Sequence, residues 1–360
     1  MREFCPDYPT ARARFRSAAS ALGARQEALD IHATGPRGES LSIDAARLGP
    51  ERPRKLVVVS SGLHGVEGYY GSAVQLQLLE RRIPHHPLPE GVGLLLLHAL
   101  NPFGMAWKRR VNEDNVDLNR NFLLPGEPYA GAPEGYAALD GMLNPPRPPG
   151  LVSAFLPRAV WSIARHGMPA LKNAVAGGQY EFPQGVFYGG SGPTQTQRLL
   201  AEALPRWAEG AERVLHIDFH TGLGTWGSYK LFVDHAWNSA GHGKLAEAFG
   251  AEFVEPWEPE KGVSYAIRGG LGTWCKAQLP DVEYDVLAAE FGTRSALQVV
   301  QAMSRENRVW HHGDRDAPGA EAERQAFCDT FVPPDRGWRE RCLPQGVHIV
   351  DQAVREAARG

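Results

Sequence analysis

Two continuous apolar runs, with a helical pattern between them, constrain the fold of this 360-residue chain most strongly. The runs are KLVVVS at 55–60 and GVGLLLLHAL at 91–100, and each has the length of a strand. A strand without polar alternation fits a parallel sheet that is covered on both faces. Between the runs, residues 69–82 place Val74 and Leu78 at helical spacing. The segment therefore predicts a βαβ unit with a right-handed crossover.

The rest of the chain continues this alternation. We predict strands at 213–219, 229–234 and 285–291, and helices at 8–29, 194–208, 242–250, 293–307 and 347–358. The pattern indicates an α/β fold with one mixed, mostly parallel central sheet flanked by helices, in a single domain over 1–360. Residues from about 122 to 192 break the pattern, and we interpret them as a long loop-rich insertion. Its glycine-rich part at 177–192 is either a lid or pocket wall, or an exposed loop.

Composition and charge exclude several classes of protein. The chain has 38 Lys and Arg against 41 Asp and Glu, a net charge of −3 at pH 7, which argues against a nucleic-acid-binding protein. The first 20 residues lack the apolar core of a signal peptide, and no apolar run is long enough to span a bilayer. We therefore expect a cytoplasmic protein without nucleic-acid or membrane partners. The oligomeric state stays open.

Polar residues follow four of the predicted strands. In chain order they are His64 and Glu67, then Arg109, Arg110, Asn119 and Arg120, then His220, and finally Glu290. The carboxyl ends of parallel strands meet at one edge of a sheet, which is where open α/β sheets bind ligands. Two histidines and one carboxylate form a known ligand set for catalytic zinc. Arginine and amide side chains beside them suit a carboxylate or a developing oxyanion.

The segment HIDFHTG at 216–222 adds possible support for this site. Asp218 lies two residues before His220 and so shares a face of the strand with it, where it can hold the histidine by a hydrogen bond. His216 lies deeper, and we expect a buried, hydrogen-bonded histidine there. The next residues, GLGTWG at 222–227, fit a dinucleotide-binding pattern. The strand predicted from 229 leaves no room for the helix that such a site needs, so we reject that interpretation.

Together these motifs resemble the zinc carboxypeptidase superfamily. They occur in the right order over residues 60–293 as H-x-x-E, N-P-x-G, D-L-N-R-N, D-x-H and E-F-G-T. The stretches SSGLHGVEGYYGSA and EDNVDLNRNF resemble most closely a bacterial branch described as a domain of unknown function. The resemblance implies one zinc ion per chain, held by His64, Glu67 and His220.

The resemblance also implies catalytic roles. Glu290 would be the general base that takes a proton from water, and later the acid that protonates the leaving amine. An arginine ahead of the D-L-N-R motif would stabilise the oxyanion. Spacing favours Arg110, and its neighbour Arg109 is the alternative.

Substrate binding is implied in the same way. Asn119 and Arg120 would bind a substrate carboxylate, and a tyrosine is expected at Tyr265, with Tyr284 as the alternative. The implied activity is hydrolysis of an amide bond in a small peptide or acyl-amino acid with a free carboxylate. Two alternatives stay open. One is an N-acyl amino acid deacylase resembling succinylglutamate desuccinylase and aspartoacylase, and the other is a non-catalytic carboxylate-binding protein on the same fold.

Overall fold

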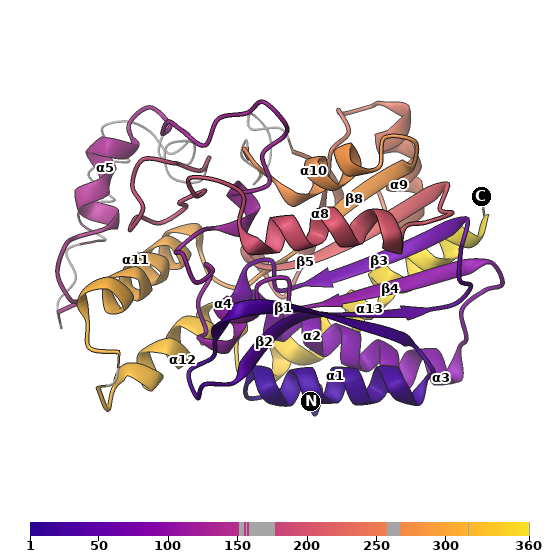
Figure 1. Cartoon of the computed structure of the whole chain (residues 1–360), viewed down its shortest axis with the longest axis horizontal. Helices are drawn as coiled ribbons and strands as arrows, with labels where there is room; N and C mark the ends of the chain where they lie inside the picture. The colour runs from indigo at the N-terminus through magenta and orange to yellow at the C-terminus, as the bar shows by residue number, and fades with distance from the viewer. Residues whose placement is uncertain (151–154, 156, 158–176, 258–266, 316, 360) are drawn as a thin grey trace.

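An eight-stranded sheet organises the computed structural model of this chain, which describes residues 1–150, 155, 157, 177–257, 267–315 and 317–359 (Figure 1). The strands are β1 (Arg25–Thr34), β2 (Ser40–Leu48), β3 (Lys55–Ser61), β4 (Val92–His98), β5 (Arg213–Trp226), β6 (Tyr229–Val233), β7 (Val254–Pro256) and β8 (Glu283–Gly292). They lie in the order β1-β2-β4-β3-β5-β8-β6-β7. The central strands β4, β3, β5 and β8 are parallel to one another. β1 pairs antiparallel with β2, β2 with β4, and β6 with β8, whereas β6 and β7 pair in parallel. The predicted mixed, mostly parallel sheet is confirmed.

Helices cover both faces of this sheet. They are α1 (Tyr8–Ala21), α2 (Gly68–Gln77), α3 (Ile83–His85), α4 (Pro102–Ala106), α5 (Tyr136–Leu143), α8 (Gln195–Trp207), α9 (Ala240–Phe249), α10 (Leu271–Gln278), α11 (Ala296–His312), α12 (Ala320–Phe331) and α13 (Arg336–Arg359). Three short helical turns add to them: η1 (Gly65–Glu67), η2 (Leu78–Arg82) and η3 (Leu118–Arg120). Figure 1 shows α1, α2 and α13 below the sheet and α8 and α10 above it. Within the described residues, no helix is both long and apolar enough to cross a bilayer.

The two apolar runs form the centre of the core, as predicted. Every residue of β4 is buried, and so is every residue of β3 after Lys55. The strands pair in parallel, with Val57 opposite Leu94, and α2 connects them. Burial on both faces explains why neither strand alternates apolar and polar residues.

The N-terminal region differs from the prediction. The helix expected over 8–29 ends at Ala21, and Gly23 follows with a φ of 68°, a left-handed conformation that ends a helix. The chain then enters β1, which pairs with β2 at an edge of the sheet. Pairing between distant segments determines this part of the fold, so local helical spacing gave the wrong element for residues 25–29.

The described part of the insertion packs against α11 and the D-L-N-R motif. It contains the short helix α5, which contacts α11, and Asn307 on α11 donates to the carbonyl of Gln184 at 2.7 Å. In the segment 177–190, residues 178–180 and 185–190 are buried, whereas Glu181, Pro183 and Gln184 are exposed. Gln179 and Tyr188 form a β-bridge, and the carbonyl of Tyr188 accepts a hydrogen bond of 2.7 Å from the N–H of Asp117. This segment therefore lies directly beside the D-L-N-R motif.

Strand register brings the polar residues of separate motifs together. His220 on β5 lies opposite Glu290 on β8, and Ser60 on β3 lies opposite Asp218 on β5. β5 continues beyond His220 to Trp226, which is longer than predicted, and turns directly into β6 without a helix. The carboxyl ends of the central parallel strands thus form one edge, as the sequence predicts.

Candidate metal centre

Three buried side chains, two from the segment just after β3 and one from β5, converge beside the sheet. His64 precedes the turn η1, which ends at Glu67, and His220 projects from β5. Nδ1 of His64 lies 3.0 Å from Oε1 of Glu67, and Nδ1 of His220 lies 3.3 Å from Oε2 of the same carboxylate. The ligand atoms of all three residues lie within 4.8 Å of one another, which is a group that could hold a metal ion. The structure therefore brings together the three residues that the sequence singled out.

Glycines make this turn possible. Gly62 has a φ of 68°, and a Cβ atom on Gly65 would lie 2.1 Å from the backbone of Gly104. The N–H groups of Gly65 and Val66 donate to the carbonyls of Arg110 and of the residue before it. Side chains larger than hydrogen would separate these two segments, so the glycines keep the two loops in contact.

Two further carboxylates fix the orientation of the histidines. Oδ1 of Asp117 lies 3.1 Å from Nε2 of His64, and Oδ2 of Asp218 lies 2.7 Å from Nε2 of His220. An ionised carboxylate only accepts hydrogen bonds, so Asp218 favours a proton on Nε2 of His220 and leaves the Nδ1 lone pair of that ring facing Glu67. Nε2 of His64 also lies 2.7 Å from Nη2 of Arg110, which can only donate, so this nitrogen has both a donor and an acceptor beside it. Neutral imidazoles and one carboxylate suit zinc, and the residues present fit that ion.

The charge on Glu67 also suits a cation. Burial acts to raise the pKa of Glu67, but its interaction with His64, its hydrogen bond with His220 and its attraction to Arg110 outweigh burial and lower the pKa overall. Burial likewise acts to lower the pKa of His220, but Asp218 raises it above its usual range. A metal at this position would therefore displace a proton from His220, which makes metal binding depend on pH.

The two neighbouring arginines point in different directions. Arg110 donates from Nη1 to Oε1 of Glu67 at 2.8 Å and from Nε to Oδ2 of Asp117 at 3.2 Å. Arg109 is fully buried, pairs with Glu306 on α11 at 2.6 Å and lies 3.9 Å above the ring of Trp310. The structure therefore places Arg110 beside the candidate ligands and Arg109 in the packing of α11.

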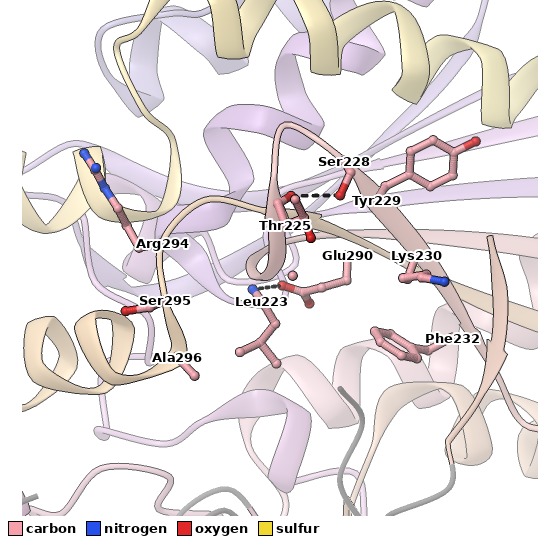
Figure 2. A pocket seen from close by; sticks show the side chains of 11 residues that line it. Leu223, Thr225, Ser228, Tyr229, Lys230, Phe232, Glu290, Arg294, Ser295 and Ala296 are labelled. Carbon is pink, nitrogen blue, oxygen red and sulfur yellow. Dashed lines mark hydrogen bonds between the residues drawn. The ribbon is translucent and has the colours of Figure 1, made fainter. Parts of the chain in front are cut away.

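Glu290 lies beside a pocket of about 290 Å³. The pocket is lined by Glu290 and by residues from the end of β5, the β5–β6 turn, β6 and the start of α11 (Figure 2). The N–H of Leu223 donates to the Glu290 carboxylate at 2.7 Å and fixes its position. Burial, and then repulsion by Glu67, raises the pKa of Glu290 from 4.5 to about 7. A carboxyl group with this pKa can both take and give a proton near neutral pH.

The D-L-N-R motif forms the turn η3 beside these residues. Arg120 is buried and donates from Nη1 to the carbonyl of Asn119 at 2.8 Å. Oδ1 of Asn119 accepts from the N–H of Leu271 at 3.1 Å, which ties the turn to the start of α10. Gly178 packs against the Arg120 side chain so closely that a Cβ atom there would lie 2.6 Å from Cδ.

Two tyrosines, Tyr265 and Tyr284, were the alternatives for the substrate-binding residue. Tyr265 lies outside the described residues. Tyr284 is buried in the core, with its hydroxyl 3.0 Å from Nδ1 of His216. His216 is the buried, hydrogen-bonded histidine that the sequence predicts. Tyr284 therefore does not face the candidate ligands.

Two residues beside the candidate ligands, Asp117 and Phe187, were not predicted from the sequence. Asp117 belongs to the D-L-N-R motif, and its acidic side chain ahead of Asn119 was a usable signal. Phe187 comes from the insertion, and no local pattern marks it. Its ring centre lies 5.7 Å from the guanidinium carbons of both Arg110 and Arg120, and its φ of 60° is unusual for a bulky residue. Such backbone strain is often found at functional sites.

Comparisons with known proteins agree with this architecture. A family model described as "Protein of unknown function (DUF2817)" matches residues 4–345, whereas no curated protein matches the chain significantly. Bovine thrombin-activatable fibrinolysis inhibitor, solved in complex with tick carboxypeptidase inhibitor, is 13% identical, with 99% of each chain covered and a TM-score of 0.51. A second structure of thrombin-activatable fibrinolysis inhibitor is 13% identical over 98% of this chain and 74% of that chain, also with a TM-score of 0.51. Carboxypeptidase A from Helicoverpa armigera is 12% identical over 89% and 73% of the two chains, with a TM-score of 0.46. At 13% identity the likeness to the two thrombin-activatable fibrinolysis inhibitor structures concerns the fold, and it confirms the fold that the sequence resemblance implies.

Proposed function

The chain belongs to the DUF2817 family, and we propose that it is a zinc-dependent hydrolase that cleaves an amide bond in a small peptide or acyl-amino acid with a free carboxylate. One observation carries the proposal. His64, Glu67 and His220 converge through their ligand atoms, and Glu290 lies opposite His220 on the neighbouring strand. The site thus combines a metal-ligand set with a carboxyl group of raised pKa, and a metallohydrolase needs both.

A zinc ion held by His64, Glu67 and His220, one per chain, would supply a Lewis acid that polarises water and the scissile carbonyl. Glu290 would accept the proton of the attacking water on its carboxylate. It would then pass that proton to the nitrogen of the leaving amine. A pKa of about 7 supports both transfers, because the group lies close to half-protonation near neutral pH.

The arginines have separate roles in the proposal. Arg110, which lies beside Glu67, would donate hydrogen bonds to the oxyanion that develops on the carbonyl. Arg120 and Asn119 would bind the free carboxylate of the substrate, since a buried guanidinium forms strong charge-assisted hydrogen bonds. We assign the substrate-binding tyrosine to Tyr265 on the sequence resemblance alone. The cytoplasmic location likewise stays a prediction.

Hydrolysis assays on the zinc-loaded protein test this proposal. Three substrate sets separate its parts: peptides with a free C-terminus, the same peptides with an amidated C-terminus, and N-acyl amino acids. We expect cleavage of free-carboxylate substrates by the wild-type protein, and turnover lowered by about 10²- to 10⁴-fold in E290Q with zinc still bound. Cleavage of N-acyl amino acids alone would make the protein a deacylase. A protein that binds zinc and carboxylates but cleaves nothing would overturn the catalytic proposal in favour of a binding function.

A further inference from the structure

A chain of buried hydrogen bonds crosses three strands behind His220. Oγ of Ser60 on β3 lies 2.5 Å from Oδ1 of Asp218 and 2.7 Å from Nε2 of His216, both on β5. Nδ1 of His216 lies 3.0 Å from the hydroxyl of Tyr284 on β8. All four of these residues are at most 3% exposed. Buried polar groups are costly unless each is hydrogen-bonded, so these hydrogen bonds fix the positions of the four side chains.

The number of protons fixes the direction of each hydrogen bond. Asp218 is an acceptor, and its two oxygens take protons from Ser60 and His220. Ser60 has a single proton, which it gives to Asp218, so it must accept from Nε2–H of His216. Nδ1 of His216 then carries the lone pair that accepts from the Tyr284 hydroxyl.

The charge state of His216 agrees with this direction. Burial lowers its pKa to about 4, so the ring is neutral near pH 7 and has one proton to place. Placing that proton on Nδ1 would turn the Nε2 lone pair of His216 toward the Ser60 oxygen and leave that oxygen without a donor. The alternative tautomer would therefore leave buried polar groups unpaired, at a cost of roughly 1–3 kcal/mol for each group.

We propose that Ser60, His216 and Tyr284 are positioning residues for the metal centre. Their hydrogen bonds run in one direction, from Tyr284 through His216 and Ser60 to Asp218, and we call this series the relay. The relay holds Asp218 and thereby fixes the ring orientation and tautomer of His220. This inference rests on the proposed function, in which His220 is a metal ligand. Without a donor at Oδ1, Asp218 can rotate or take up a water molecule. The Nδ1 lone pair of His220 would then no longer be fixed toward Glu67.

Zinc affinity of the full chain, measured by competition with a chelator, tests the relay. S60A removes the central hydroxyl, and we expect affinity to fall roughly 10- to 100-fold, as for other groups that orient metal ligands. S61A is the matched control, because Ser61 is equally buried but bonds to Gln75 and lies outside the relay. Y284F keeps the ring and removes the last donor, and we expect it to lower affinity several-fold. This variant keeps the test decisive if S60A does not fold.

A second measurement determines the direction of these hydrogen bonds in the metal-free protein. Nitrogen-15 NMR of the histidines in the metal-free protein should show His216 as the Nε2–H tautomer at pH 7. An Nδ1–H tautomer would overturn the assigned direction. If the wild-type protein binds zinc but S60A and Y284F bind it as tightly as S61A does, the positioning role is wrong. If the wild-type protein binds no zinc, the proposed function itself fails, and the tautomer of His216 still decides the direction of the relay.

Discussion

Replacing Glu290 by glutamine should stabilise the protein while removing its activity. The pKa of Glu290 rises from 4.5 to about 7 on folding, through burial and then through repulsion by Glu67. Between these two values the unfolded chain releases a proton that the folded protein keeps. The free energy of unfolding therefore falls as pH rises through this window. A difference of about 2.5 pKa units corresponds to a cost of about 3 kcal/mol, which is fully present above pH 7.

Glutamine avoids this cost, because it is uncharged and can still accept the hydrogen bond from Leu223. We expect metal-free E290Q to exceed the wild-type free energy of unfolding by up to about 3 kcal/mol at pH 8, and by much less at pH 5. Urea denaturation at the two pH values measures both differences. E283Q is the control on the same strand. The pKa of Glu283 is lowered by its hydrogen bond with Lys244, so its replacement should give no stabilisation at pH 8.

The catalytic half of this prediction uses the zinc-loaded protein. Loss of a general base should reduce turnover by about 10²- to 10⁴-fold, while zinc stays bound because Glu290 is not one of the three ligands. An equal change in stability at pH 5 and pH 8 would show that the carboxyl is not buried at raised pKa. Wild-type turnover in E290Q would refute its role as the base.

Four further variants test the roles assigned to the three arginines and to Asp117. R120A should raise KM roughly 10- to 100-fold for substrates with a free carboxylate and spare amidated ones, because a hydrogen bond to a charged group is lost; equal effects on both substrate sets would remove the binding role. R110A should lower kcat roughly 10²- to 10³-fold, as expected for an oxyanion donor. R109M should instead lower the free energy of unfolding by about 3–5 kcal/mol in urea denaturation, because Glu306 loses its buried partner. If R109M lost turnover and R110A lost stability, Arg109 would be the oxyanion donor and Arg110 the packing residue. D117N should weaken zinc binding roughly 10- to 100-fold in chelator competition, because His64 loses its orienting carboxylate, and unchanged affinity would contradict that role.

The central strands were predictable because their sequences are locally unambiguous. The runs that become β3 and β4 are buried on both faces, and each contains four consecutive apolar residues, LVVV in β3 and LLLL in β4. β1 was not predictable in the same way. It is an edge strand with mixed exposure, and its pairing with β2 is specified by distant residues. The same cause explains why the first predicted helix extended past Gly23.

The candidate site divides along similar lines. Residues in motifs at strand ends, such as His64 and His220, could be located from the sequence because the topology of a parallel sheet brings those ends together. Choosing Arg110 over Arg109 needed three-dimensional structure, because adjacent residues in an irregular loop have no fixed facing direction. Phe187 belongs to the insertion, whose sequence has no periodic pattern that would indicate which residues are buried or what they contact.

Metal content of the purified protein tests the central claim most directly. Plasma mass spectrometry of the wild-type protein and of H220A, both prepared with added zinc and then dialysed, gives the number of ions per chain. The account predicts about one zinc per wild-type chain and its loss in H220A, since two protein ligands hold zinc much more weakly than three. Wild-type protein without zinc, or H220A that retains it, would contradict the assignment of His64, Glu67 and His220 as the metal centre.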